Sequence, residues 1–254
     1  MDSLAKYSRE YERHYRTSSF ELELIRIRRK KVNESLTRHR HDRIMEIGCG
    51  LEPMFLHITG FTAYTLVEPS PQFMKNAKRL APTRSNICFI QDYLENAYDE
   101  LSAMPVHDFI IISSVLHEVP DPKKFLKVLF KLSGASTVIH INVPNVLSFH
   151  RLLGMEAGIT KSVYEKSEDE IRFYRYTQFT KSSLVRMIED AGFEIISSGT
   201  YFIKPFSNAQ MEHLLKTGII DEKIIRGLEN MATYLPEMGC EIYVDIRKAK
   251  STNQ

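Results

Sequence analysis

The sequence is poor in the features that mark several large classes of protein. It contains no tryptophan and only three cysteines among its 254 residues. The cysteines, Cys49, Cys88 and Cys240, are too few and too scattered for a disulfide framework or a zinc site. We therefore expect buried free thiols in a reducing compartment.

Long apolar runs and an excess of charge of one sign are also missing. No stretch approaches the ~20 apolar residues that span a bilayer, and the first residues lack the apolar core of a signal peptide. The net charge is +2, and no basic stripe suited to a phosphate backbone is present. We expect a cytoplasmic protein, monomer or homodimer, that binds neither nucleic acid nor membrane.

What the chain does contain, from residue 43 onward, is a regular alternation of short apolar runs with helical segments. Such alternation predicts an α/β fold with a doubly wound, mostly parallel sheet. Helices are expected from about residue 53 and over 70–80, 94–101, 121–130 and 180–191. The expected strands are 44–48, 64–68, 87–91, 108–113, 137–143, 193–203 and 241–247.

Three segments fall outside this alternation. Residues 1–42 form an N-terminal helical segment, which Thr17-Ser18-Ser19 divides into two helices. Irregular insertions occupy about 145–179 and 205–238. We expect residues 43–254 to form one domain, with these three segments as lid and caps over its ligand-binding edge.

The turn Gly48-Cys49-Gly50 follows the first strand, and Glu68 closes the second. Small residues at such a turn let the backbone approach a ligand closely. A carboxylate at the tip of the next strand can accept hydrogen bonds from both hydroxyls of a ribose. Together they predict a nucleoside pocket at the carboxyl ends of parallel strands.

Glu46-Ile-Gly48-Cys-Gly50 followed by Glu68 resembles the first two motifs of class I S-adenosylmethionine-dependent methyltransferases, and we place the chain with the bacterial small-molecule type. The third glycine of a dinucleotide fingerprint is absent, and Glu52 follows the turn instead. This departure favours a zwitterionic sulfonium over NAD. The resemblance implies a Rossmann-like sheet of seven strands that ends in a hairpin, and S-adenosylmethionine as cofactor.

The resemblance also implies cofactor-binding residues. Asp92 would bind the adenine amino group and Tyr93 a ring nitrogen through its backbone, although Asp92 could instead cap a helix. Glu46 would reach the ligand's ammonium group or hold the loop, and Tyr11 would close over the methionine end. The full set is Glu46, Gly48, Cys49, Gly50, Glu68, Asp92, Tyr93, Ser114 and Tyr11.

The fourth strand ends in Ser113-Ser-Val-Leu-His117-Glu118, which resembles the family's fourth motif. Methyl transfer needs alignment, desolvation and, for a protonated acceptor, removal of a proton. His117 is the candidate base, since its ordinary pKa suits neutral pH, but it could equally pack against the cofactor and orient the loop. Glu118 could orient that imidazole or cap the next helix.

Acceptor-binding candidates lie in the first insertion: Asn145, His150, Arg151, Tyr174 and Arg175. An arginine can fork onto a carboxylate or phosphate, although a solvated helix face or the edge of a lid explains the same residues. No Asn/Asp-Pro-Pro-Tyr motif for base methylation is present.

We expect methyl transfer to an oxygen, or second to a nitrogen, of a small anionic metabolite or sugar-pathway intermediate. A nucleotide-dependent oxidoreductase and a non-catalytic S-adenosylmethionine-binding scaffold remain as alternatives.

Overall fold

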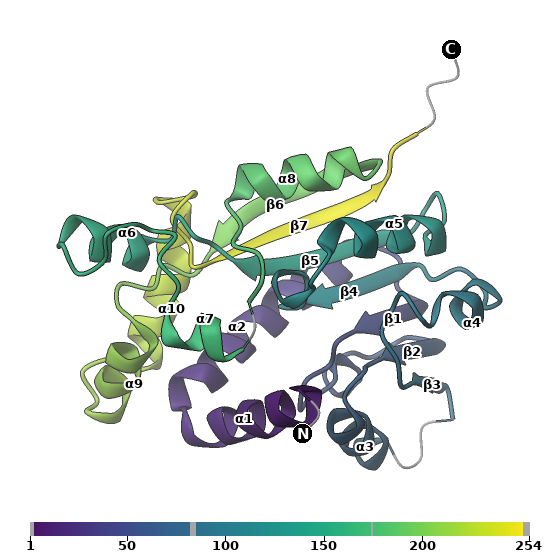
Figure 1. Cartoon of the computed structure of the whole chain (residues 1–254), viewed down its shortest axis with the longest axis horizontal. Coiled ribbons are helices and arrows are strands. Elements are labelled where there is room, and N and C mark those ends of the chain that lie inside the picture. Colours follow the sequence, from purple (N-terminus) through teal and green to yellow (C-terminus); the bar gives the residue numbers. More distant parts are fainter. Residues whose placement is uncertain (1–2, 82–84, 174, 251–254) are drawn as a thin grey trace.

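The computed structural model describes residues 3–81, 85–173 and 175–250. Within them one sheet of seven strands runs through the molecule in the order β3-β2-β1-β4-β5-β7-β6 (Figure 1). The strands are β1 (Arg43–Ile47), β2 (Ala63–Val67), β3 (Ile87–Ile90), β4 (Phe109–Ser113), β5 (Val138–Pro144), β6 (Phe193–Tyr201) and β7 (Glu241–Lys248).

The first five strands pair in parallel, and β7 lies antiparallel between β5 and β6. This is the predicted fold class, with the expected hairpin at its end. The reversal of strand order falls between β1 and β4, where ligands bind in open α/β sheets.

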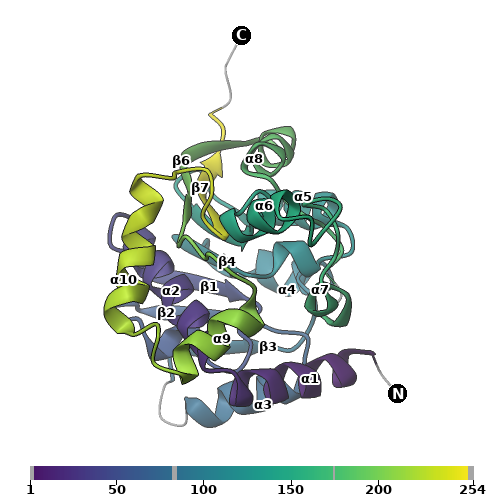
Figure 2. The same ribbon diagram turned by 90° about the vertical axis from the view of Figure 1, so that its left-hand side faces the viewer.

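Helices cover both faces of the sheet (Figures 1 and 2). Alternate residues of β4 show the two layers, since Ile110 and Ile112 pack on one side and Phe109 and Ile111 on the other. The first layer contains α4 (Tyr98–Ser102), α5 (Pro122–Leu132) and α8 (Lys181–Asp190). The second contains α2 (Ser19–Leu36) and α3 (Pro71–Leu80).

Local sequence explains where these helices begin. Ser18, Ser70 and Asp121 each accept a backbone N–H of the first turn, and prolines at 71 and 122 suit the positions that follow. Thr180 and Ser183 form a reciprocal capping box at the start of α8.

The helix predicted from about residue 53 is wrong, because only a 3₁₀ turn (Met54–Leu56) follows the loop. Ile58 and Thr59 are β-branched, and Gly60 takes a φ of +85°, which ends helical geometry. The helix predicted over 94–101 shrinks in the same way to a turn and α4.

The N-terminal segment divides into α1 (Ser3–Thr17) and α2. The second of these helices belongs to the core, since Phe20, Leu24 and Ile27 join a third apolar cluster with Met211 and Ile225. The latter two residues lie on α9 (Asn208–Lys216) and α10 (Glu222–Asn230) of the second insertion. Figure 2 shows α9 and α10 flanking α2. The first insertion contains α6 (Phe149–Glu156) and α7 (Glu168–Arg172).

The structure bears on the expected burial of the cysteines and on the expected absence of a membrane-spanning segment. Cys49 and Cys240 are buried free thiols, but Cys88 is exposed on the edge strand β3, so the prediction of buried cysteines is wrong for it. Over the described part of the chain, no helix has the length and apolar character needed to cross a bilayer.

Candidate functional site

A cavity of about 360 Å³ opens at the carboxyl ends of β1, β2 and β4. The loops after these strands line one side, and α1, α2 and the segment after α7 line the other. All nine residues expected to bind the cofactor border this cavity: Glu46, Gly48, Cys49, Gly50, Glu68, Asp92, Tyr93, Ser114 and Tyr11.

The turn after β1 depends on its two glycines. Gly48 and Gly50 have φ angles of +75° and +55°, which side chains disfavour. A Cβ on Gly48 would lie 2.5 Å from Cγ2 of Val115, so no larger residue fits there. The Gly48 N–H donates to the carbonyl of Val67 over 2.9 Å, which holds the turn against β2.

Glu68 follows β2 and is 4% exposed. Its Oε2 accepts the Cys49 N–H over 3.0 Å, and its Oε1 accepts the Ser70 N–H over 2.8 Å. Burial raises the pKa of this carboxyl to about 7, although both hydrogen bonds oppose the shift. Oε2 also accepts the Cys49 thiol over 3.7 Å, whereas Oε1 can accept a further hydrogen bond, because a carboxylate offers about four lone-pair sites.

Glu46 braces the loop. Both of its oxygens accept the Met54 N–H at 3.1 Å, and Oε2 also accepts the Tyr64 hydroxyl over 2.6 Å. Burial raises its pKa to about 7. Of the two roles considered for Glu46, holding the loop is the one that these contacts perform.

Asp92 and Tyr93 border the cavity beyond β3, where Asp92 is half-buried and Tyr93 is exposed. Oδ1 of Asp92 accepts the Tyr93 N–H and the Asn96 side-chain amide over 2.7 and 2.8 Å. Asp92 therefore holds a turn rather than capping α4, whose N-cap position is Ala97.

Ser114 adopts a φ of +61° directly after β4. A left-handed conformation in a residue with a side chain stores strain and is concentrated at functional sites. The Ser114 N–H donates to the carbonyl of Asn142 over 3.0 Å, which ties this strained position to β5.

Helix α1 lies across the cavity. Tyr11 packs against the glycine turn, since a Cβ on Gly50 would lie 3.3 Å from its hydroxyl oxygen. Tyr15 donates to Oε1 of Glu52 over 2.6 Å, and the hydroxyl groups of Ser8 and Ser70 are 2.7 Å apart. These contacts hold α1 over the loops that follow β1 and β2.

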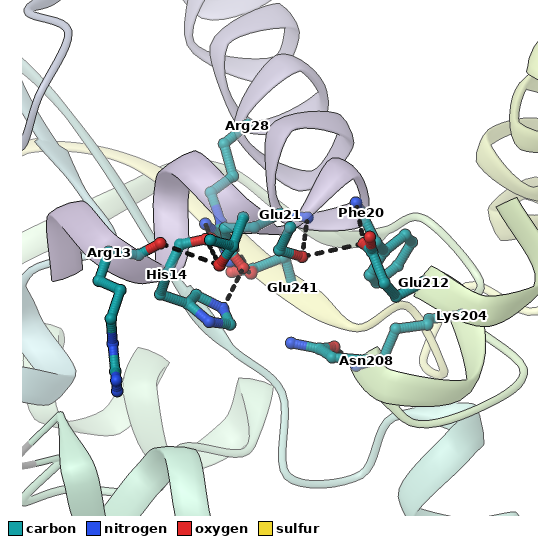
Figure 3. A network of polar contacts seen from close by, with 11 residues as sticks. Arg13, His14, Phe20, Glu21, Arg28, Lys204, Asn208, Glu212 and Glu241 are labelled. Carbon is teal, nitrogen blue, oxygen red and sulfur yellow. Dashed lines mark hydrogen bonds and ion pairs between the residues drawn. The ribbon is translucent and has the colours of Figure 1, made fainter. Parts of the chain in front are cut away.

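A buried charge network lies on the same side of the cavity as α1 and α2 (Figure 3). Arg28 on α2 binds Oε1 of Glu241 over 2.8 Å and Oε1 of Glu21 over 3.1 Å. His14 lies 3.8 Å from the other oxygen of Glu21. Burial alone would raise the pKa of Glu21, but Arg28 and His14 lower it to about 2.

Lys204 and Asn208 lie beside this network (Figure 3). The buried Lys204 ammonium donates to Oδ1 of Asn208 over 2.5 Å. An ammonium group can only donate, so this contact fixes the orientation of the amide. The Asn208 amide nitrogen then points away from Lys204, and Asn208 itself lines the cavity.

Arg175 enters the cavity from the segment after α7. Its Nε is buried, and among the described residues it has no hydrogen-bond partner. Arg175 still influences the site, because its charge lowers the pKa of Glu118 and of Glu21.

His117 and Glu118 occupy different surroundings although they are neighbours. His117 is 2% exposed and is not among the residues that line the cavity. Burial and the charges of Arg175 and Arg28 lower its pKa well below the ordinary value, which makes it a weak base. Glu118 lines the cavity.

The remaining acceptor candidates do not meet in the cavity. Asn145 donates to the carbonyl groups of Glu237 and Gly239, which joins the two insertions. His150 contacts the Ser148 hydroxyl over 3.0 Å.

Arg151 braces its own insertion, because it donates to Val163, Glu165 and Glu170 over 2.8–2.9 Å. Tyr174 lies outside the described residues. Of the four candidates that the structure describes, only Arg175 lines the cavity.

Sequence reasoning missed several residues that line the cavity, among them Glu21 and Arg28. Glu21 and Arg28 lie on one face of α2, because seven residues make about two helical turns. Their spacing in the sequence therefore indicated that they could form an ion pair. Asn208 lies in the second insertion, which carries no motif, and the fold brings it to the cavity.

A family model for a methyltransferase domain matches residues 13–198. Comparison with curated proteins gives no match.

Solved structures resemble the chain over most of its length. A Thermotoga maritima S-adenosylmethionine-dependent methyltransferase, described as a possible histamine N-methyltransferase, is 18% identical with a TM-score of 0.60, covering 96% of this chain and 99% of that one.

Two other structures are similar. The plantazolicin methyltransferase BamL, in complex with a triazolic desmethylPZN analogue and S-adenosylhomocysteine, is 19% identical with a TM-score of 0.58, covering 97% of this chain and 91% of that one. The N-methyltransferase NodS of Bradyrhizobium japonicum is 11% identical with a TM-score of 0.56, covering 91% and 97%. At these identities the likeness shows the fold.

The family model spans more than half of the chain and includes the glycine turn, Glu68 and the loop after β4. The resemblance seen in the sequence motifs is therefore confirmed, and this chain belongs to the methyltransferase-domain family of the class I fold.

Proposed function

We propose that the protein transfers a methyl group from S-adenosylmethionine to an oxygen atom of a small acidic metabolite, with nitrogen as the second candidate. The observation that carries this proposal is the cavity at the carboxyl ends of β1, β2 and β4, in a chain of the methyltransferase family. In this proposal α1 is the lid, and residues 43–254 with their two insertions form the catalytic domain.

The residues around the glycine turn suit the cofactor. Oε1 of Glu68 keeps a lone pair for a ribose hydroxyl, and Oδ2 of Asp92 is left for the adenine amino group, since the Tyr93 and Asn96 donors are on Oδ1. Gly48 and Gly50 allow a close approach of the backbone. S-adenosylmethionine would supply a methyl group that is already activated on a sulfonium.

An acidic acceptor is supported by the donors on the far side of the cavity. Arg175 has a buried Nε without a partner among the described residues, and Lys204 orients Asn208 so that its amide nitrogen is left to donate. A carboxylate or phosphate would satisfy both, because a guanidinium group binds such anions through paired hydrogen bonds.

Equilibrium binding tests the cofactor assignment. Titration calorimetry should give micromolar or tighter binding of S-adenosylhomocysteine and no binding of NAD. Glu68→Gln should weaken S-adenosylhomocysteine binding by about 30-fold or more, because an amide NH₂ replaces one accepting oxygen. Glu100→Gln on α4, outside the cavity lining, is the matched control and should bind as the unmodified protein does.

The same experiment separates the alternatives. NAD binding without S-adenosylhomocysteine binding would make the protein an oxidoreductase. Tight S-adenosylhomocysteine binding with no transfer of labelled methyl to fractionated cell metabolites would make it a scaffold.

Arg175 is tested with the acceptor that such fractionation identifies. Arg175→Ala should raise KM for an acidic acceptor at least tenfold and leave S-adenosylhomocysteine binding unchanged. An equal loss with the corresponding methyl ester would overturn the acidic-acceptor proposal.

A further inference from the structure

Glu118 lines the cavity, and one of its two carboxylate oxygens is held by a hydrogen bond from α1. It ends the 3₁₀ turn Leu116–Glu118 after β4, and 23% of its side chain is exposed. Oε2 accepts the Tyr7 hydroxyl over 2.7 Å. Oε1 lies 3.6 Å from Nε2 of His117 and accepts no hydrogen bond from the described residues. One oxygen is thus held from the lid, and the other is available.

Charged and titratable groups surround this carboxylate from several elements. Burial raises the pKa of Glu118 to about 7. Arg175, the Tyr7 hydrogen bond and Arg28 oppose that shift, whereas Glu68 adds to it. His117 on the same turn is held neutral, because its own pKa is lowered well below the ordinary value.

We propose that Glu118 is the residue that removes the acceptor's proton during methyl transfer, and that Tyr7 positions its carboxylate. This inference rests on the proposed function. Oε1 of Glu118 takes the proton, while Oε2 stays hydrogen-bonded to Tyr7 on α1.

The step balances in atoms and charge. The acceptor's O–H or N–H bond breaks and an O–H bond forms on Glu118. The acceptor's electron pair forms the new bond to carbon, and the pair of the carbon–sulfur bond stays on sulfur. One positive charge and one negative charge disappear together. In a cavity shielded from water, such neutralisation favours the product side, because separated charges are costly there.

The geometry favours Glu118 over His117 for this role. His117 does not line the cavity, whereas Glu118 does, and a base must come within hydrogen-bond reach of the proton that it removes. A group that titrates near neutral pH is also suited to both accept and release a proton.

The test measures binding, so it does not depend on knowing the acceptor. The affinities of S-adenosylmethionine and S-adenosylhomocysteine are measured by calorimetry between pH 5.5 and 8.5. An ionised Glu118 attracts the sulfonium, so the preference for S-adenosylmethionine should rise with pH through about 7. Glu118→Gln should lower this preference about tenfold at pH 8 and flatten its pH dependence.

Glu46 and Glu68 also have pKa values raised to about 7 and line the same cavity. The Glu118→Gln variant therefore shows whether the pH dependence of the preference comes from Glu118. Glu95→Gln, another cavity-lining carboxylate, is the control for the loss of one charge and should keep the pH dependence. An unchanged preference and slope in Glu118→Gln would overturn the proposal.

Tyr7 has a separate readout. Tyr7→Phe removes a hydrogen bond to the ionised carboxylate, so the midpoint of the pH dependence should move to higher pH. Tyr15→Phe removes an equivalent hydrogen bond from the same helix to Glu52 and should leave the midpoint in place. A midpoint that does not move in Tyr7→Phe would remove the positioning role.

Failure of the two proposals can be told apart. If the unmodified protein binds neither S-adenosylmethionine nor S-adenosylhomocysteine, the proposed function falls. If it binds both and Glu118→Gln behaves as the unmodified protein, only the role of Glu118 falls. With an identified acceptor, Glu118→Gln should also lower kcat by about 100-fold or more.

Discussion

Glu46 illustrates how a single side chain couples the cavity to stability. It is 3% exposed and accepts hydrogen bonds from Met54 and Tyr64. Because burial raises its pKa to about 7, the folded protein binds a proton that the unfolded chain releases near pH 4.5. Its contribution to stability is therefore complete below pH 4.5 and is lost as pH rises through 7.

A pH series of unfolding measurements tests this. The free energy of unfolding should fall between pH 5 and pH 8, and Glu46→Gln should reduce that fall by about 2 kcal/mol. Glu68 and Glu118 contribute falls of the same sign, so only the difference between the two proteins reports on Glu46. Parallel pH profiles would contradict the assignment.

At this scale the nine residues that the sequence proposed for cofactor binding all border one cavity, and their binding role stays a prediction. Gly48, Gly50 and Glu68 stand in a short, ordered motif, so local pattern was enough to name them. Glu118 was expected to orient His117 or to cap the next helix, whose N-cap is Asp121, because its hydrogen bond to Tyr7 joins residues 111 positions apart and could not be foreseen. Contacts of that range leave no trace in local periodicity.

Among the elements, the first insertion is held together by Arg151, a residue that the sequence analysis expected to bind the acceptor. Arg151 holds the backbone at 163 and 165 and the Glu170 carboxylate. Arg151→Ala should therefore increase amide exchange over 157–173 and lower stability by about 2–4 kcal/mol. S-adenosylhomocysteine affinity should change less than about threefold, because Arg151 does not line the cavity.

Lys161→Ala, at an exposed position of the same insertion, is the control and should leave exchange unaltered. Lost acceptor binding with unaltered exchange in Arg151→Ala would restore the binding role that the sequence predicted.

Removal of α1 should have a different effect from removal of α2. Its hydroxyl groups contact Glu118, Glu52 and Ser70, all at or beside the cavity, whereas α2 supplies core residues. A chain lacking residues 1–16 should therefore fold and should release S-adenosylhomocysteine at least about tenfold faster in stopped-flow experiments. An unchanged release rate would show that α1 is not a lid.

Helix and strand positions were largely predictable, because caps and apolar alternation are local signals. The turn at residues 53–62 was not, since proline and glycine there allow both a helix and a 3₁₀ turn. In the structure, Glu46 of the preceding strand accepts the Met54 N–H at the start of the 3₁₀ turn, a contact that local pattern does not reveal.

For the whole molecule, Asp245 on β7 joins elements from both ends of the chain. Its Oδ1 accepts Ser35 and His140 over 2.7 Å each, and its Oδ2 accepts Ser197 over 2.8 Å. Burial opposes ionisation, but these partners lower the pKa of Asp245. Its stabilising effect is therefore present at neutral pH and is lost on acidification through the lowered value.

Asp245→Ala should lower the free energy of unfolding by about 3–5 kcal/mol at pH 7, measured in urea. The loss should shrink in acid as the carboxylate is protonated. Asp190→Ala, at an exposed position that ends α8, should stay within about 0.5 kcal/mol of the unmodified protein. Equal effects of the two substitutions would contradict a joining role for Asp245.

The position of β7 between β5 and β6 has a consequence for incomplete chains. In the sheet, β6 pairs with β7 alone. A truncated chain that stops before residue 241 therefore lacks the strand that joins β6 to the sheet. It would leave β5, whose Ile139 and Ile141 belong to the core, as an open edge, and such edges pair readily with other chains. Prematurely terminated chains should therefore aggregate or be degraded. They should not persist as inactive proteins that sequester the cofactor.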